Sequence, residues 1–396
     1  MPLNRSDLKK FREAGLNGAT WFTTSQVQMQ KPYWDANHGR FIYDRHLPTG
    51  NTVLGLNWTQ GRGIFCLLAA FELTGKPGYL ESAIRAAEYI KILQIYDCPD
   101  NPRRQFAIRE EVPQSRRSAP RDATEAALGL LFLYRVTREP DYLRRAVDYA
   151  TWFERNVWNK SKWPIGVVSL VDENHSTTEY SFQTAHAALF YYLFLATKKK
   201  AYLQRVRHLA DEGIRRYMHA DGSIRTAQYD PHHTLPGGEV LNDDGYMASV
   251  LCAYQAFGDK KYLDVALSHS QWLRTAIRPP LPMLSALPCM STVMVELSAI
   301  TGDPVHRDWA VKMLQKHVLP LQVKGKDPKT AGAFRGEDEP VEYYGPKTAK
   351  KTDFITTRVT AYATLACLKL VGIVGPYYGS VGWKRKVRKT PKLTVI

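Results

Sequence analysis

The sequence predicts an all-α fold, an (α/α)6 toroid in which helical hairpins form a ring, with short β-like loops on the active face. Two observations lead to this prediction. Five stretches are apolar nearly all round, which is typical of helices buried on every side. Each is followed by a short turn and a second helix with apolar residues at i, i+3, i+4 and i+7. The five apolar stretches begin near residues 64, 125, 185, 247 and 291.

The turns between the paired helices share a pattern. Gly or Pro breaks the first helix in most copies, and a turn this short forces an antiparallel hairpin. A sixth inner helix fits at 356–370, and an N-terminal helix at about 6–30 is the outer partner that closes the ring. We therefore expect six hairpins in one domain, residues 1–382, and a basic tail at 383–396. The turns read TGKPGYL (74–80), TREPDYL (137–143), TKKKAYL (197–203), FGDKKYL (257–263) and TGDPVHR (301–307).

Long connections gather on one face of the predicted ring, at the N-terminal ends of the inner helices. Long loops on a rigid scaffold usually carry binding and catalysis. Three of them contain a β-like piece with an Arg, which predicts short strands or hairpins lining a cleft; the alternative is coincidence in a basic protein. The long connections are about 96–121, 157–181, 219–242 and 321–355, and the one at 276–285 is short. The three pieces are FAIRE (106–110), GSIRT (222–226) and AFRGE (333–337).

The chain is strongly basic. Lys and Arg number 54 against 38 Asp and Glu, so the formal net charge is +16. This surplus predicts a positive field that attracts an acidic polysaccharide, a membrane surface or a nucleic acid. No recognised nucleic-acid motif is present, so we expect no nucleic-acid partner. The run WKRKVRKTPKL at 383–393 is typical of a solvated tail or of a peripheral contact with an anionic membrane.

The first residues, MPLNRSDLKKFREAG, carry charges where a signal peptide needs an apolar stretch. No run of about eighteen apolar residues is present, so we expect no membrane span. The five cysteines lack CxxC spacing, and four of them fall in apolar helical stretches, which argues against structural disulfides and a zinc site. We therefore expect a cytoplasmic protein without a metal or a cofactor. The cysteines are Cys66, Cys98, Cys252, Cys289 and Cys367.

Carboxylates, arginines and aromatic residues stand at the N-terminal ends of the inner helices and therefore face the predicted cleft. That mixture suits a sugar, because hydroxyl groups need paired polar partners and sugar rings stack on aromatic faces. The arginine fork matches a uronate carboxylate, since it binds two oxygens at once. The candidate catalytic residues are Asp122, Asp243 and Asp244, and the candidate substrate-binding residues are Trp58, Arg62, Arg121, Glu125, Glu179, Tyr180, Gln183, His186, Tyr246, Arg335 and Arg358.

The acidic candidates have a second interpretation as helix caps. Asp is a good N-cap residue, so Asp122 and Asp243 are each consistent with capping alone. Only one of the adjacent Asp243 and Asp244 can cap, which leaves the other to face the cleft, and two close acids shift each other's pKa. Glu125 lies one turn beyond Asp122 on the same face, where it is placed to hold a hydroxyl group or to act as the second acid.

Three other candidates also have alternatives. His186 stands among Ala and Phe residues, a setting more typical of a core histidine with satisfied hydrogen bonds than of a ligand. Arg121 and Arg358 are too costly to bury without an anion. That anion is either a carboxylate of the protein or the substrate, and the sequence leaves both open.

With these turns, the chain resembles the six-hairpin glycosidase superfamily over about residues 57–370. Within that group, the segment at 241–273, which begins LNDDGYM, is similar to the stretch that carries the catalytic aspartate of unsaturated glucuronyl and rhamnogalacturonyl hydrolases. The resemblance implies that Asp244 or Asp243 is the catalytic acid, protonating a vinyl ether so that water can add. It also implies that Asp122 is the second acid.

Two features depart from the pattern of those hydrolases. Asn242 stands where they have an aromatic residue, and the segment lies on the fourth inner helix rather than nearer the N-terminus. Related toroids include polysaccharide lyases, β-glucuronidases, N-acylglucosamine epimerases and glucuronyl epimerases. The fold alone does not choose among these activities.

Three functions therefore stay open at this point. The first is a glycoside hydrolase for acidic, uronate-containing oligosaccharides, with carboxyl groups as acid and base. The second is a polysaccharide lyase or sugar epimerase that removes the proton beside the uronate carboxylate. The third is a non-catalytic protein that binds a polyanion. The crowding of acids and arginines at the inner-helix N-termini favours an enzyme. For a lyase or epimerase the important residues are Tyr180, Tyr246, His186 and Arg358.

Overall fold

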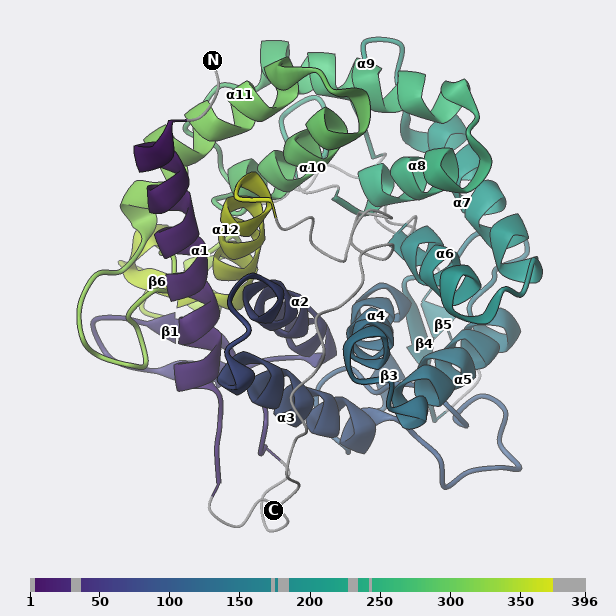
Figure 1. The fold of residues 1–396 in the computed structure, drawn as a ribbon. Coiled ribbons are helices and arrows are strands. Elements are labelled where there is room, and N and C mark those ends of the chain that lie inside the picture. The colour runs from purple at the N-terminus through teal and green to yellow at the C-terminus, as the bar shows by residue number, and fades with distance from the viewer. Residues whose placement is uncertain are drawn as a thin grey trace.

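The structure, a computed structural model, describes residues 4–29, 37–171, 175–176, 185–226, 234–241 and 244–372. In this part of the chain twelve α-helices form a ring of two layers (Figure 1). The predicted (α/α)6 toroid is confirmed. The inner helices are α2 (Asn57–Thr74), α4 (Pro120–Thr137), α6 (His186–Thr197), α8 (Asp244–Phe257), α10 (Ala286–Thr301) and α12 (Thr357–Leu370). The outer helices are α1 (Arg5–Ser25), α3 (Pro77–Leu93), α5 (Pro140–Asn156), α7 (Ala201–Tyr217), α9 (Lys260–Ala276) and α11 (Pro304–Met313).

The N-terminal helix is shorter than the sequence pattern predicts. α1 ends at Ser25 rather than near residue 30, because Gln26 has an extended backbone with φ −60° and ψ 138°. The Gln26 side-chain amide donates to the carbonyl oxygens of Gly39, at 2.9 Å, and Ser82, at 3.0 Å. These hydrogen bonds tie the end of α1 to the loop before α2 and to α3.

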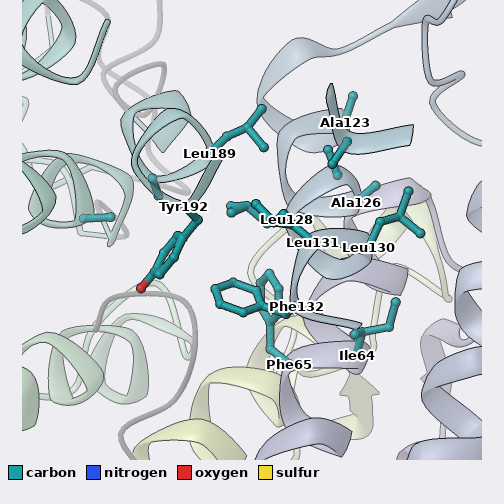
Figure 2. Packing of buried hydrophobic residues seen from close by; sticks show 14 of the residues in the cluster. Ile64, Phe65, Ala123, Ala126, Leu128, Leu130, Leu131, Phe132, Leu189 and Tyr192 are labelled. Atoms are coloured by element: carbon teal, nitrogen blue, oxygen red, sulfur yellow. The ribbon is translucent and has the colours of Figure 1, made fainter. Parts of the chain in front are cut away.

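The inner helices are buried on every side, as their apolar sequences predict. In α2 all residues from Ile64 to Phe71 are buried. Aromatic rings join neighbouring inner helices edge to face: Phe65 of α2 lies 5.7 Å from Phe132 of α4, and Phe132 lies 4.7 Å from Tyr192 of α6, between ring centroids (Figure 2). Each such pair adds about 0.5–1.5 kcal/mol beyond the burial of its area. The core therefore runs continuously through α2, α4 and α6, within the larger of two clusters of buried apolar residues.

Five inner helices are followed by a residue with left-handed backbone, which directs the chain into the outer helix. Gly75 has φ +70°, and a Cβ added there would meet no atom within 4 Å. In two copies a larger residue takes this conformation, Arg138 with φ 64° and Lys198 with φ 63°. The turn is held by a backbone hydrogen bond such as Lys198 N to Phe194 O, at 2.8 Å.

Helix α1 closes the ring by packing against α12, as the sequence predicts (Figure 1). The two helices approach closely at Gly18, where an added Cβ would lie 2.0 Å from Thr364 Oγ1. The Trp21 indole Nε1 donates to the carbonyl oxygen of Lys329, at 2.9 Å. The two ends of the described chain are thus joined by side-chain and backbone contacts.

Two small antiparallel sheets lie at the N-terminal ends of the inner helices. β6 leads directly into α12, and β3 ends just before α4 begins. In the first sheet β1 pairs with both β2 and β6, and in the second β4 pairs with both β3 and β5. The short β-like elements predicted for this face are confirmed. The strands are β1 (Ile42–His46), β2 (Thr52–Leu54), β3 (Arg117–Ser118), β4 (Val167–Ser169), β5 (His175–Ser176) and β6 (Phe354–Thr356).

Each of the four long loops folds back on itself soon after the outer helix ends, and each forms its own antiparallel β-bridge. Three of the bridges fall in FAIRE, GSIRT and AFRGE, so their predicted β character is confirmed. Their arginines are used locally: Arg225 lies 2.6 Å from the Asp221 carboxylate, and Arg335 donates to Thr352 O at 3.1 Å. The bridges pair Gln94 with Ile108, Trp158 with Pro164, Met218 with Ile224, and Gln322 with Phe334.

All five cysteines are free thiols, and the four in helices, Cys66, Cys252, Cys289 and Cys367, are buried. Within the described ranges, none of the helices combines the length and apolar character needed to cross a membrane. The predicted basic tail at 383–396 lies outside the described residues.

Candidate active site

The N-terminal ends of α2, α4 and α12 bring a group of charged and aromatic side chains together. Most belong to the first turns of these helices, and one comes from the loop before α4. We call this group the site cluster. Its members are Trp58, Arg62, Glu110, Arg121, Asp122, Glu125 and Arg358.

A buried ion pair joins α2 to α4 at the base of the cluster. Arg62 donates through Nε and Nη2 to both carboxylate oxygens of Glu125, with 2.8 Å between Nη2 and Oε1. Arg121 Nη1 lies 2.8 Å from the same Glu125 oxygen. The side chains of Arg62 and Glu125 are only 1% and 0% exposed. Glu125 therefore orients two arginines. It lies one turn beyond Asp122, as predicted, but its side chain is in the core rather than in an open cleft.

Asp122 lies in the first turn of α4 but does not cap it. Helix α4 begins at Pro120, its N-cap residue is Ala119, and no side chain caps it. The capping interpretation of Asp122 is therefore wrong. Burial raises the pKa of the Asp122 carboxyl group, and Arg121, Arg358 and Arg62 oppose that shift. The side chain keeps 23% of its exposure, so this carboxyl group is also accessible.

Glu110 lies within the electrostatic reach of Asp122, although the sequence pattern does not single it out. Its carbonyl oxygen accepts a hydrogen bond from the backbone N–H of Asn57, which begins α2, at 2.8 Å. Its carboxylate lies 2.5 Å from Nε of Arg117. Burial raises the pKa of Glu110, and the negative charge of Asp122 raises it further. The two carboxyl groups therefore interact, and Glu110 holds a proton more readily while Asp122 is ionised.

Trp58 and Arg358 form the aromatic and cationic side of the cluster. The guanidinium carbon of Arg358 lies 5.5 Å from the centroid of the Trp58 ring. Arg358 Nη1 lies 3.1 Å from Glu339 Oε1 and 3.8 Å from Asp338 Oδ2. Burial lowers the pKa of Arg358, but Tyr43 and the two carboxylates more than offset this, so the group stays charged. Protein carboxylates thus accompany Arg358, whose side chain is still 19% exposed.

Three of the predicted substrate-binding residues make their described contacts outside the site cluster. His186 is buried against Phe153, and its Nδ1 lies 2.7 Å from Thr124 Oγ1. Burial, with a contribution from Arg121, lowers the pKa of His186 to about 3, so the ring is neutral. This setting matches the core interpretation of His186. Tyr246 is fully buried in α8, and Arg335 is held in its own loop by Thr352.

Five other candidates are not described in enough detail to be placed in the site. Glu179, Tyr180, Gln183 and Asp243 lie outside the described residues. Asp244 begins α8, but its side chain lies outside the described part as well. Their roles stay predictions. Across the ranges that are described, no group of three or more His, Cys, Asp or Glu side chains could hold a metal ion.

Sequence reasoning missed Glu110 of the site cluster, and also Glu339 and Tyr43, which contact Arg358 and Trp58 of the cluster. Tyr43 of β1 lies 6.0 Å from Trp58, between ring centroids. One signal was available: FAIRE ends in Glu110, and AFRGE is followed by two further acids, Asp338 and Glu339. Glu110 belongs to the cluster, and Asp338 and Glu339 pair with its Arg358, whereas Arg335 stays in its own loop.

No family model and no curated protein sequence matches the chain. Solved structures do share its architecture. A cellobiose 2-epimerase from Bacillus thermoamylovorans is 11% identical, with a TM-score of 0.71, over 93% of this chain and 99% of that one. An unsaturated glucuronyl hydrolase from a Bacillus species is 15% identical, with a TM-score of 0.68, over 93% and 99% of the two chains. The chain has the six-hairpin glycosidase fold.

An α-1,6-mannanase from a Salegentibacter species shares the same fold at 12% identity, with a TM-score of 0.61, over 92% of this chain and 99% of that one. The expected resemblance to the six-hairpin glycosidase superfamily is thus confirmed for the fold. These proteins are hydrolases and epimerases that act on sugars, and at such low identity the activity of this chain has to be argued from its own side chains.

Proposed function

We propose that the chain is a carbohydrate-processing enzyme that hydrolyses uronate-containing oligosaccharides. The observation that carries the proposal is the interacting pair of carboxyl groups, Asp122 and Glu110, in the site cluster. Both pKa values are raised, Asp122 by burial and Glu110 by burial and by the charge of Asp122. A glycosidase needs one protonated and one ionised carboxyl group, and neighbouring acids in different environments supply that difference.

The surroundings of the pair suit an acidic sugar. Arg358 and Arg121 are partly exposed guanidinium groups beside Asp122, and each can pair with both oxygens of a uronate carboxylate. The ring of Trp58 is buried and lies against Arg358, so it holds the guanidinium group on the side that faces the cluster. The N-terminal ends of α2, α4 and α12 add partial positive charge to the same place, which also favours an anionic substrate.

The second catalytic group has two candidates. Glu110 interacts with Asp122 directly, through charge. Asp244, with its neighbour Asp243, begins an inner helix and is the acid that the family resemblance implies. The mannanase gives this second choice some support, because its inactive variants carry replacements at two adjacent aspartates. In either case Asp122 is the shared partner, and one carboxyl group donates a proton to the substrate while the other activates water.

Single replacements separate these candidates: Asp122→Asn, Glu110→Gln, Asp243→Asn and Asp244→Asn. The substrates are unsaturated uronate oligosaccharides. Their hydrolysis is measured by the loss of ultraviolet absorbance and by a product mass that increases by one water. Replacing Asp122 and its true partner should each lower kcat by about 10²–10⁴-fold, while the helical circular dichroism spectrum is unchanged. Turnover in the native protein should fall as pH rises through the pKa of the proton donor.

A matched control is Asp141→Asn, because Asp141 lies in the first turn of the outer helix α5 as Asp122 does in α4. This variant should keep full activity. Full activity in Asp122→Asn would contradict the proposal. A rise in absorbance with saturated polyuronate would instead indicate a lyase. Incorporation of solvent deuterium at the carbon beside the carboxylate would indicate an epimerase. Binding without turnover would indicate a polyanion-binding protein.

A further inference from the structure

Two buried carboxyl groups lie beside the site cluster without belonging to it. Asp44 is on β1, and Glu337 follows the bridge that Arg335 makes with the strand β6. Asp44 is 1% exposed and Glu337 is 2% exposed. One oxygen of each carboxyl group, Oδ2 of Asp44 and Oε2 of Glu337, makes no hydrogen bond within the described structure. An ionised carboxylate in such a place is costly, so a proton is the natural occupant.

Their environments favour the protonated form. Burial raises the pKa of Asp44 to about 7. Burial also raises the pKa of Glu337, to about 8, and the charges of Asp338 and Asp44 add to this, while a hydrogen bond from the Glu339 backbone N–H opposes it. Two acids that interact in a dry setting cannot both be ionised cheaply, so they titrate as a pair.

The groups that face this pair come from four elements. β1 supplies Tyr43, and α12 supplies Arg358. The loop after Glu337 supplies Asp338, Glu339 and Tyr344. The short helix η6 (Lys351–Asp353) supplies Lys351, which donates to the carbonyl oxygen of Asp338 at 2.8 Å.

The charge on Glu337 therefore acts on Arg358. Asp338 and Glu339 already lie within 3.8 Å and 3.1 Å of its guanidinium group. Ionised Glu337 adds a third carboxylate to the field on Arg358, and that field competes with any anion that approaches from the site cluster. Protonated Glu337 leaves the arginine with more of its positive charge to offer.

We propose that Glu337, whose proton the charge of Asp44 helps to hold, is a positioning residue that stays protonated while Arg358 binds the carboxylate of the substrate. Ionisation of Glu337 weakens that binding without any contact between Glu337 and the substrate. This inference rests on the proposed function, because it requires that Arg358 binds a uronate. It names the residue that sets how tightly the acidic sugar is held as the pH changes.

The test is binding of glucuronate to the full chain, measured by calorimetry between pH 6 and pH 9. In the native protein the affinity should fall about tenfold from pH 7 to pH 9, because Glu337, whose pKa is about 8, is the second member of the pair to ionise. Glu337→Gln should bind as tightly as the native protein at pH 7 and keep that affinity at pH 9. Asp44→Asn removes a charge that favours the Glu337 proton, so its affinity should begin to fall at lower pH.

Glu239→Gln is the matched control, because Glu239 also lies in a bridged loop and pairs with an arginine, Arg225. It should keep the native pH profile. Infrared difference spectra read the proton without any ligand: the band of a protonated carboxyl group at pH 7 should disappear in Glu337→Gln. An unchanged band, or the same pH profile in Glu337→Gln as in the native protein, overturns the inference. Absence of glucuronate binding at every pH overturns the proposed function instead, and the inference with it.

Discussion

The two ends of the inner-helix ring hold the same kind of ion pair in different settings. At the N-terminal ends, Arg62 and Glu125 join α2 to α4, with the partly exposed Arg121 and Asp122 beside them. At the opposite ends, which we call the far end, Lys369 of α12 and Glu296 of α10 lie 3.1 Å apart, with side chains 2% and 1% exposed. Buried charge alone therefore does not mark a functional site. A functional site is marked instead by charged neighbours that are accessible to solvent.

The far-end pair should govern stability. Glu296→Gln removes the carboxylate that pairs with the buried Lys369 ammonium group, so the free energy of unfolding should fall by about 3–5 kcal/mol. This is the largest stability effect that we expect, and urea denaturation measures it. The KM of the molecules that stay folded should not change, because Glu296 lies at the end of the ring away from the site.

The double variant Glu296→Leu with Lys369→Met separates charge from packing. Replacing a buried pair by apolar residues of similar size is often neutral or stabilising, so much of the lost stability should return. If the double variant is as unstable as Glu296→Gln, the charge imbalance is not the cause. A change in KM in either variant would break the comparison between the two ends.

At the site end, Arg358→Gln should affect binding as well as stability, because it also leaves the buried Asp338 without its arginine. It removes the charge that pairs with the substrate carboxylate, and a hydrogen bond to a charged group contributes about 1.5–3 kcal/mol, so KM for a uronate substrate should rise roughly tenfold to a hundredfold. Arg358→Lys keeps the charge but loses the fork, and should show part of this effect. An equal loss with a neutral oligosaccharide would contradict the assigned role of Arg358.

The smallest expected effect is at the far-end turns. Lys198 holds a left-handed backbone, φ 63°, which costs a residue with a Cβ roughly 1 kcal/mol. Lys198→Gly should raise stability by up to about 1 kcal/mol and leave turnover unchanged, measured by Tm and kcat. Gly75→Ala is the reverse control, since its Cβ would meet no neighbour and only the backbone angle is penalised. Equal stability of the native protein, Lys198→Gly and Gly75→Ala would rule out the left-handed backbone as a source of strain.

The ring is predictable from the sequence because its pattern is local. A helix that is apolar all round, a short turn and an amphipathic helix fall within about forty residues, and the unit recurs. The end of α1 was less predictable. It is set by hydrogen bonds from Gln26 to Gly39 and Ser82, residues that no helical pattern connects to it.

The site was only partly predictable for the same reason. Asp122, Trp58 and Arg358 each lie in the first turn of an inner helix, and a helix start can be recognised from its sequence. Glu110 and Glu337 reach the site through loops whose paths depend on distant contacts, and Asp44 lies beside Glu337 because β1 pairs with β6. Sequence spacing also places Arg62 and Glu125 on the site face without showing that they bind each other.

The closure of the ring by α1 has a consequence for how the protein is made. Phe11, Trp21 and Phe22 of α1 have no exposed surface in the finished fold, and α12, the helix that α1 packs against, is synthesised last among the described helices. A chain emerging from the ribosome therefore carries an amphipathic helix whose apolar face lacks its main partner through most of translation. The contact that completes the toroid is also its longest-range one, so it belongs to the slow end of folding, when aggregation competes most strongly.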